Sequence, residues 1–530
     1  MGIATAERMA AQVRRHPLIL LFLLCGGLIL AYQSAQAILS NDIQTLVLIG
    51  MAFICCAIVI TILNDWRRGL YMMLCWLLVE DLFRKYLGNN MAIFFAKDFL
   101  AAVVYLSFFL AWRRKEVEIL RPPFYIPLIV FVWFCFCQVF NPSSTSIIFG
   151  ALGMKLFFYY VPLMLVSYAL VDTEIALRKF FTVNMMMICV ISGLGIIQAI
   201  AGHTFLNPAI AQEDIRELSN LYRVAPISGV MVYRPTSVFV SAGRFGNFLL
   251  VAWPLTLGYV GYLLLRYKKG RIFAFVTLTI TFGAAVLAAS RGLFMSTLLS
   301  TAGCIVAFLW GAPKREGGTV RILRAIQRSA FGITLAIALL LATYPDALMG
   351  RVAVYVETLS PYSPASELSH RTGDYPLRNF IAAFTYPQWP YGYGIGGTAL
   401  GTQYIARYFH VKPSVTGVES GYGELVVEIG IVGLLLWLVW TTAAVGSCVK
   451  VVRQLKGSPY LPIAFVIFWY AAALLFAYTY AGIQAYEDYI LNAYLWLLFG
   501  ILFRLPHLKL SAEHAAATKM AVEPHPRWIA

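Results

Sequence analysis

Charge is what this sequence has least of. Charged residues make up 12% of its 530 residues, against 60% hydrophobic residues, whereas about a quarter of the residues of a soluble domain are charged. The shortage excludes an ordinary soluble domain. It leaves apolar stretches of about 20 residues along most of the chain, each long enough to cross a bilayer core of about 30 Å. We therefore expect an all-α fold, a polytopic transmembrane helix bundle.

The apolar stretches predict about fourteen spans, with the N- and C-termini both on the cytoplasmic side. The first span follows a basic segment, as in a signal peptide, but it lacks a small-residue cleavage site and is predicted to be retained. One transmembrane domain would cover residues 1–510, with an inserted extracytoplasmic loop at 344–423 that carries short interfacial helices. A cytoplasmic tail would follow at 511–530, with loose structure from Leu505. The predicted spans are 17–38, 43–63, 69–88, 91–112, 124–140, 150–171, 180–201, 245–265, 272–289, 292–311, 329–343, 424–445, 460–481 and 488–504.

Acidic residues are also few, with 25 Asp and Glu against 41 Lys and Arg, so the net charge is +16. With the N-terminus inside, the basic clusters fall on one side of the membrane and most acids on the other, as the positive-inside rule requires. The charge therefore indicates topology. Because the basic residues are scattered over short loops, nucleic acid is not an expected partner.

Three further features are missing. No period of 20–50 residues recurs. No D-x-D motif or carboxylate–histidine cluster argues for a metal, so neither a metal nor a cofactor is expected. The nine cysteines lie in or beside spans, which argues against a disulfide framework.

Two outer segments, residues 202–244 and 344–423, are much longer than the other connections. Connections of this length without an obvious domain of their own are usually functional. Within the second segment, Pro376 to Tyr386 has the mixed apolar and polar pattern of a short interfacial helix.

Five arginines fall on the outer side, against the positive-inside rule. An anionic ligand such as a lipid pyrophosphate is the simplest reason to keep positive charge there, since the guanidinium fork matches phosphate oxygens. These residues are Arg223, Arg234, Arg244, Arg291 and Arg371.

The segment around Arg291 separates two apolar stretches with almost no loop. Ser290 precedes the arginine, and Gly292 is expected to let the backbone turn tightly. The alternative is a snorkelling arginine that marks a helix end. For Arg234 and Arg244 the alternative is surface salt bridges with acids of residues 213–217.

Other candidates follow in the second outer segment. His370 precedes Arg371, and a glycine-dense stretch includes Gly394 and Gly396. The residues before the span at 424–445 include a further acid, Glu419. Glu424 and Glu428 are four apart, hence on one helix face, and should face a cavity or a partner rather than lipid. For Glu428 a structural hydrogen-bonding role is as well supported as a catalytic one.

The order of these elements resembles the O-antigen ligase and O-antigen polymerase superfamily of membrane glycosyltransferases. Its pattern is R-x-T-G-x-F before a span, S-R-G between two spans, an early arginine in a large outer loop, P-x-x-G-x-G, and H-N-x-x-L…E-x-G-x-x-G opening the next helix. The corresponding residues are Arg234–Phe239, Ser290–Gly292, Arg371, Pro390–Gly394, and Glu419-Ser420 with Glu428–Gly433.

Three departures from that pattern bear on the function. Ser237 stands where glycine is usual, Gly243-Arg244 replaces Pro-Asn, and Glu419-Ser420 occupies the His-Asn position. The last change disfavours an O-antigen ligase and favours the branch that polymerises exopolysaccharide.

The resemblance implies a type-C glycosyltransferase-like fold in the bacterial inner membrane, with an active site facing the periplasm or exterior. One undecaprenyl-pyrophosphate-linked oligosaccharide would be transferred to the sugar hydroxyl of another. The arginines would bind the pyrophosphate, and Glu419, His370 or His410 would be the base. The lipid bilayer, a flippase and chain-length or export proteins would be further partners.

Two alternatives stay open. A ligase that joins the glycan to lipid A core or to a protein would share the donor site and differ in its acceptor. A flippase for lipid-linked oligosaccharides would also have 12–14 spans. Lys97-Asp98, an ionisable pair within the predicted fourth span, is the best argument for transport, although we prefer a structural pair. A flippase should also show repeats and short outer loops, which this chain lacks.

Overall fold

The computed structural model describes residues 36, 43–87, 91–208, 221–311, 318–368, 374–402, 406, 409–412 and 418–522. The chain divides into two compact units. Unit 1 consists of residues 1–73 and 99–108, and unit 2 of residues 74–98 and 109–530.

Helices account for almost all of the regular structure in the described ranges. Every predicted span from 43–63 onward overlaps a helix, while the predicted span 17–38 lies outside the described residues. The elements are α3 (Ile43–Asn64), α4 (Trp66–Tyr86), α5 (Met91–Arg113), α6 (Tyr125–Gln138), α7 (Ile147–Phe158), α8 (Leu163–Leu170), α9 (Glu174–Ala201), β1 (Tyr222–Val224), β2 (Met231–Tyr233), α11 (Ala242–Arg266), α12 (Arg271–Leu287), α13 (Arg291–Gly311), α14 (Gly318–Thr343), α15 (Pro345–Leu359), α16 (Tyr375–Ala383), α18 (Gly421–Gln454), α19 (Leu461–Ala472), the π-helix η3 (Ala473–Tyr478), α20 (Thr479–Ala481), α21 (Gln484–Glu487) and α22 (Tyr489–Val522).

Among the described residues, eight helical segments are long and apolar enough to cross a membrane. The protein is accordingly an all-α membrane protein. These segments are Ala92–Arg113, Ile147–Leu170, Glu174–Ala201, Ala242–Arg266, Arg291–Gly311, Gly421–Gln454, Leu461–Ala481 and Tyr489–Ser511.

Unit 1 is held together by close helix contacts. The Ser107 hydroxyl donates to the Ile62 carbonyl at 2.8 Å, and the rings of Trp66 and Phe108 meet edge to face, 5.3 Å apart. Gly69 lies against the Ile62 side chain, where a β-carbon would not fit. A small residue is therefore needed for this approach.

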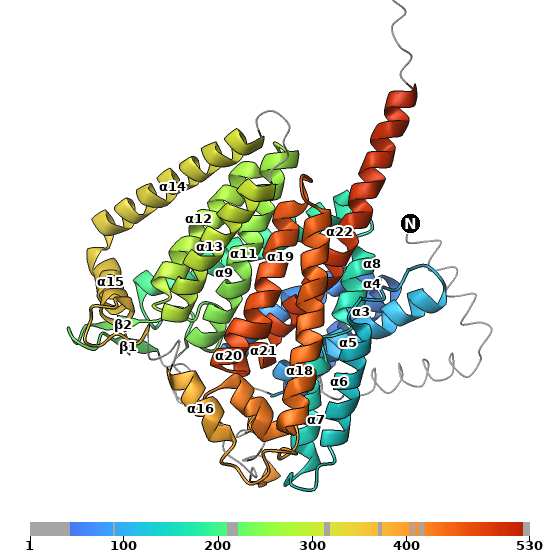
Figure 1. The fold of residues 1–530 in the computed structure, drawn as a ribbon, viewed down its shortest axis with the longest axis vertical. Coiled ribbons are helices and arrows are strands. Elements are labelled where there is room, and N and C mark those ends of the chain that lie inside the picture. Colours follow the sequence, from blue (N-terminus) through green and yellow to red (C-terminus); the bar gives the residue numbers. More distant parts are fainter. Residues whose placement is uncertain are drawn as a thin grey trace, which may run out of the picture. The chain divides into compact units, whose positions relative to one another are not determined.

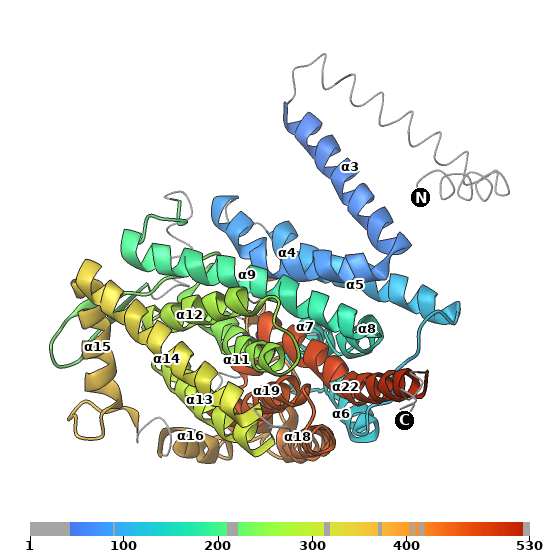
Figure 2. The ribbon, with the colours of Figure 1, turned by 90° about the horizontal axis from the view of Figure 1, so that it is seen from above.

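In unit 2, α11 packs against α12, α13 and α19, while α8 packs against α22 and α6 against α18 (Figures 1 and 2). Three tryptophans, Trp437, Trp440 and Trp496, are fully buried between these helices. The helix α14 runs obliquely across α12 (Figure 1).

Three spans differ in detail from their prediction. The helix expected at 150–171 is split into α7 and α8 before Pro162, which has no N–H to continue the hydrogen-bond ladder. The span at 460–481 contains the π-helix η3. The loose structure expected from Leu505 is wrong, because α22 continues to Val522.

The described parts of the two long connecting segments, 202–244 and 344–423, lie at the same end of unit 2. The hairpin β1–β2, α15 and α16 are found there, opposite the end at which α22 finishes (Figure 1). The short helix expected at 376–386 is present as α16. The hairpin was not predicted.

Candidate functional site

The β1–β2 hairpin and α15 form one rigid support. Arg351 of α15 is buried, and its guanidinium donates to the carbonyls of Leu287 at 2.7 Å and Tyr233 at 2.9 Å. Burial lowers the pKa of Arg351 to about 10. These bonds join the end of α12 to the end of β2, directly before Arg234.

Arg291 is positioned by the turn between α12 and α13. The backbone of Ala289 is left-handed, with φ of 50°, and α13 begins at Arg291. The expectation that Gly292 makes the turn is wrong, because Gly292 is already a residue of α13 and a β-carbon there would meet nothing. The buried Ala289 makes it instead, a conformation that costs a non-glycine residue about 1–2 kcal/mol.

Arg223, Arg234 and Arg291 come together from three different segments. Burial lowers the pKa of Arg223 to about 10, and the positive charges of Arg291 and Arg234 lower it further. Burial and the charge of Arg291 also lower the pKa of Arg234. Like charges this close repel one another. The fold therefore holds the three guanidinium groups together against their mutual repulsion.

One carboxylate lies among these arginines. Glu367, eight residues after the end of α15, forms an ion pair with Arg291 at 2.5 Å, and its side chain is 37% exposed. Its negative charge partly offsets the lowering of the Arg223 pKa. The Tyr355 ring stacks on Phe294 of α13, with centroids 4.6 Å apart, and its hydroxyl donates to the Val286 carbonyl at 2.9 Å. We call Arg223, Arg234, Arg291 and Glu367 the arginine cluster.

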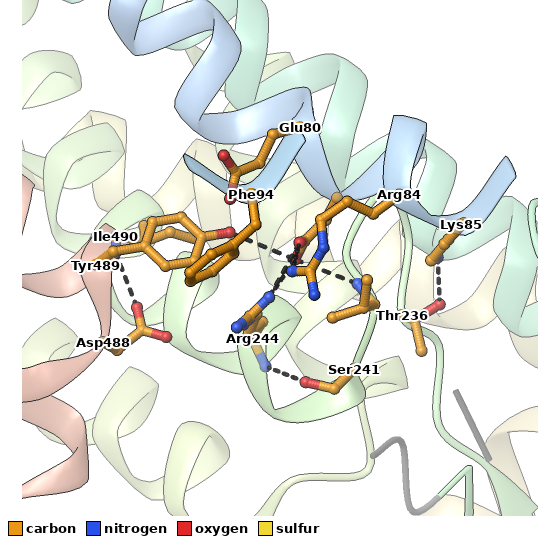
Figure 3. Close-up of polar contacts among 12 residues, drawn as sticks. Glu80, Arg84, Lys85, Phe94, Thr236, Ser241, Arg244, Asp488, Tyr489 and Ile490 are labelled. Atoms are coloured by element: carbon orange, nitrogen blue, oxygen red, sulfur yellow. Dashed lines mark hydrogen bonds and ion pairs between the residues drawn. The ribbon is translucent and has the colours of Figure 1, made fainter. Parts of the chain in front are cut away.

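Arg244 is engaged elsewhere. Its guanidinium donates to both oxygens of Asp81 at 2.9 Å, and Arg84 reaches the same carboxylate at 2.9 Å. Asp81 is fully buried and also accepts from the Tyr489 hydroxyl at 3.3 Å. Figure 3 shows Arg84 and Arg244 pointing toward the same place. The predicted salt-bridge partners at 213–217 lie outside the described residues.

A loop connects this buried ion pair to the arginine cluster. Arg234 is at its start, and at its end the amide of Val240 donates to Asp81 at 3.3 Å. Lys85 donates to the Thr236 hydroxyl at 2.8 Å and to the Ser237 carbonyl at 2.7 Å (Figure 3).

Ser237 has a left-handed backbone, with φ of 51°. Its hydroxyl donates to the Ile191 carbonyl at 2.7 Å, and its amide donates to Gln198 at 2.6 Å. The position at which the resembling family usually has glycine therefore has the backbone conformation that glycine adopts most readily.

Lys97 and Asp98 are each paired, but not with one another. Lys97 donates to Glu80 at 2.8 Å, and Asp98 pairs with Lys155 at 2.5 Å. The ammonium of Lys97 also lies 3.4 Å from the centre of the Phe94 ring. Because each charge has an opposite charge within the fold, both pairs are typical of ion pairs that stabilise structure.

Glu428 holds the glycine-dense stretch. Its carboxylate accepts from the amides of Gly396 at 3.0 Å and Thr398 at 2.7 Å, and from the Thr398 hydroxyl at 2.8 Å. Gly394 and Gly396 have φ of 97° and 84°, and a β-carbon at Gly396 would lie 2.1 Å from the Phe149 carbonyl oxygen. Glycine is required there both for conformation and for space.

Other predicted residues are not brought to the arginine cluster by any described contact. Glu424 accepts from the amide of Ile483 at 3.3 Å. Glu419 is exposed and accepts from the Tyr375 hydroxyl at 2.5 Å. His410 is exposed. His370 and Arg371 lie outside the described residues.

Sequence reasoning did not single out Glu367, Arg351, Asp81 or Lys85. The only signal was the run Glu80-Asp81 with Arg84-Lys85, four charges inside a predicted span. Glu367 and Arg351 had no signal, because their roles depend on partners far away in the chain.

Models of known protein families do not match this chain, and a search of curated proteins finds no match.

Proposed function

We propose that this protein is a glycosyltransferase of the O-antigen ligase and polymerase type. It would polymerise undecaprenyl-pyrophosphate-linked oligosaccharides on the outer face of a bacterial inner membrane. In this proposal the chain crosses the membrane about fourteen times, with both ends inside. The long segments 202–244 and 344–423 then face the exterior, which agrees with the position of β1–β2, α15 and α16 at one end of unit 2.

The observation that carries the proposal is the arginine cluster. The positive charge of Arg291, at the start of α13, is close enough to lower the pKa of both Arg223 and Arg234. A partly exposed carboxylate is the negative group placed among them. A diphosphate carries the charge and the oxygen geometry that such a group of arginines matches.

Two further observations support the resemblance. Ser237 has a left-handed backbone at a position where the family usually has glycine. The stretch Pro390–Gly394, which corresponds to the first glycine motif of the family, lies in contact with the later E-x-G-x-x-G motif, since the amides of Tyr393 and Gly394 donate to the carbonyls of Val427 and Glu428 at 2.8 Å. Two motifs that are more than thirty residues apart in the sequence are thus joined by backbone hydrogen bonds.

The chemistry is a single displacement. The bond between the donor sugar and pyrophosphate breaks, a bond to the acceptor oxygen forms, and the acceptor proton passes to a base. Arg223, Arg234 and Arg291 neutralise the pyrophosphate as it leaves. Glu419 is our first candidate for the base, with His370 and His410 next.

Enzyme and flippase are separated in detergent. The purified protein, given lipid-linked repeat units from its own host, is expected to lengthen the glycan without a sealed bilayer, whereas a flippase would need one. Glycans that stay at single-unit length in detergent would contradict the proposal. The Arg291→Ala variant serves as the matched control.

Polymerase and ligase differ in what accumulates after deletion of the gene. Single repeat units stranded on the lipid are expected for a polymerase. Long preassembled chains on the lipid would indicate a ligase that joins glycan to lipid A core or to protein.

A further inference from the structure

The hairpin β1–β2 presents its apolar face outward. In the antiparallel register Tyr222 lies opposite Tyr233, and Val224 opposite Met231. Tyr222, Val224 and Met231 are 46%, 52% and 63% exposed. Arg223 is on the other face, opposite the buried Val232. A hairpin on a water-covered surface has the reverse arrangement, with apolar residues inward and charges outward.

The helix α15 has an apolar face of the same kind. Met349, Val352 and Val356 are spaced three and four residues apart, so they lie on one side of the helix. They are all exposed. The helix and the hairpin are joined, because Glu357 accepts from the amides of Ile227 at 2.7 Å and Ser228 at 3.2 Å.

This surface continues the apolar surface of α14. Phe331, Leu335 and Leu339 are four residues apart and exposed along one side of α14. Tyr344, also exposed, connects α14 directly to α15. Helix α14 packs against both α12 and α15, and its second half coincides with the span predicted at 329–343.

We propose that the hairpin and α15 insert their shared apolar face into the outer leaflet of the bilayer. Exposed apolar groups then leave water, while Arg223, on the opposite face of the hairpin, stays with Arg234 and Arg291 near headgroup level. The occupant is lipid because the apolar face of α15 follows, through the exposed Tyr344, directly on the apolar side of α14, which coincides with a predicted span. The assignment to the outer leaflet rests on the topology of the proposed function, but the inference is independent of the proposed glycosyl transfer.

Photo-crosslinking tests the contact directly. Benzoylphenylalanine is placed at Met231, Val224 or Val352 of the full-length protein in nanodiscs of phosphatidylethanolamine and phosphatidylglycerol. The control position is Thr145, which is exposed in the polar connection between α6 and α7. After illumination, mass spectrometry should find several-fold more lipid adduct at the hairpin and α15 positions than at Thr145.

Two results would overturn the inference. Lipid adducts no more abundant than at Thr145 would place the face in water. Crosslinks between two protein chains would make it an interface between copies. Use of two hairpin positions guards against a single variant that fails to fold, and no readout depends on enzyme activity.

Discussion

Two groups of arginines lie in unit 2, one around a fully buried carboxylate and one around a partly exposed carboxylate. Arg84 and Arg244 share the fully buried Asp81, at 2.9 Å each, and this carboxylate also accepts hydrogen bonds from Tyr489 and Val240. In the arginine cluster, the partly exposed Glu367 pairs with Arg291 and also acts on Arg223. Arginine thus contributes to cohesion around Asp81, whereas in the cluster it brings like charges close together.

Burial and partner count distinguish these roles. A buried charge without its partner costs several kcal/mol, so an arginine paired with a buried carboxylate stabilises the fold. Like charges held together at a partly exposed place lower stability, and they persist where an anion is to be bound. The loop from Arg234 to Val240 joins the two groups, so the buried pair also fixes one side of the cluster.

The largest effect is expected for Asp81→Ala. It leaves Arg84 and Arg244 without their counter-charge and should lower the free energy of unfolding by about 3–5 kcal/mol. Thermal unfolding of the purified protein, followed by tryptophan fluorescence, measures this. The matched control is Glu367→Ala in the cluster, where loss of a partly exposed ion pair should cost about 1 kcal/mol or less. Equal losses of unfolding free energy in the two variants would show that the buried and the partly exposed ion pairs contribute equally to stability.

Arg291→Ala should act on function and spare the fold. Loss of one group that stabilises a leaving charge lowers a rate by about 10²–10³. Polymer should vanish from cells while protein abundance and melting temperature stay near wild type. Arg291→Lys keeps the charge but not the fork, so it should retain intermediate activity. Normal polymer with Arg291→Ala would end its assignment to the pyrophosphate.

The connecting loop is tested by Ser237→Val. A β-branched residue at φ of 51° is strained and loses the bond to Ile191, which together should cost about 1–3 kcal/mol. Ser237→Gly relieves the strain but loses the same bond, so it should stay within about 1 kcal/mol of wild type. Differential scanning fluorimetry compares the two. A valine variant as stable as the glycine variant would show that backbone conformation does not constrain this loop.

Most of the helices could be predicted from the sequence, because a bilayer demands long apolar stretches and hydropathy reports them directly. The places where helices are interrupted were harder to predict than the helices themselves. Pro162 gave a local signal for the break between α7 and α8, but the turn before Arg291 depends on Ala289, a residue with no intrinsic preference for it. The hairpin was missed because its strands have only three residues each.

Side-chain partners could not be predicted in the same way. The sequence indicated that five outer arginines needed an explanation, and the structure places three of them together. It could not separate Arg244 from these, because its partner Asp81 is 163 residues earlier in the chain. Likewise Lys97 and Asp98 looked like a pair but bind Glu80 and Lys155. Adjacency in sequence is a poor guide to ion pairing within a bundle.

The smallest effect is expected for Glu367→Gln. This variant tests most directly whether the arginine cluster binds a phosphate. The carboxylate holds Arg291 at 2.5 Å from a partly exposed position, so an incoming phosphate must displace it. Its neutral replacement should strengthen binding of inorganic pyrophosphate to the purified protein by up to about fivefold, since an exposed ion pair contributes about 1 kcal/mol or less. Isothermal titration calorimetry in detergent measures the change, with the buried-pair variant Glu80→Gln as control. Weaker pyrophosphate binding in Glu367→Gln would mean that the carboxylate orients the arginines for the ligand instead of competing with it.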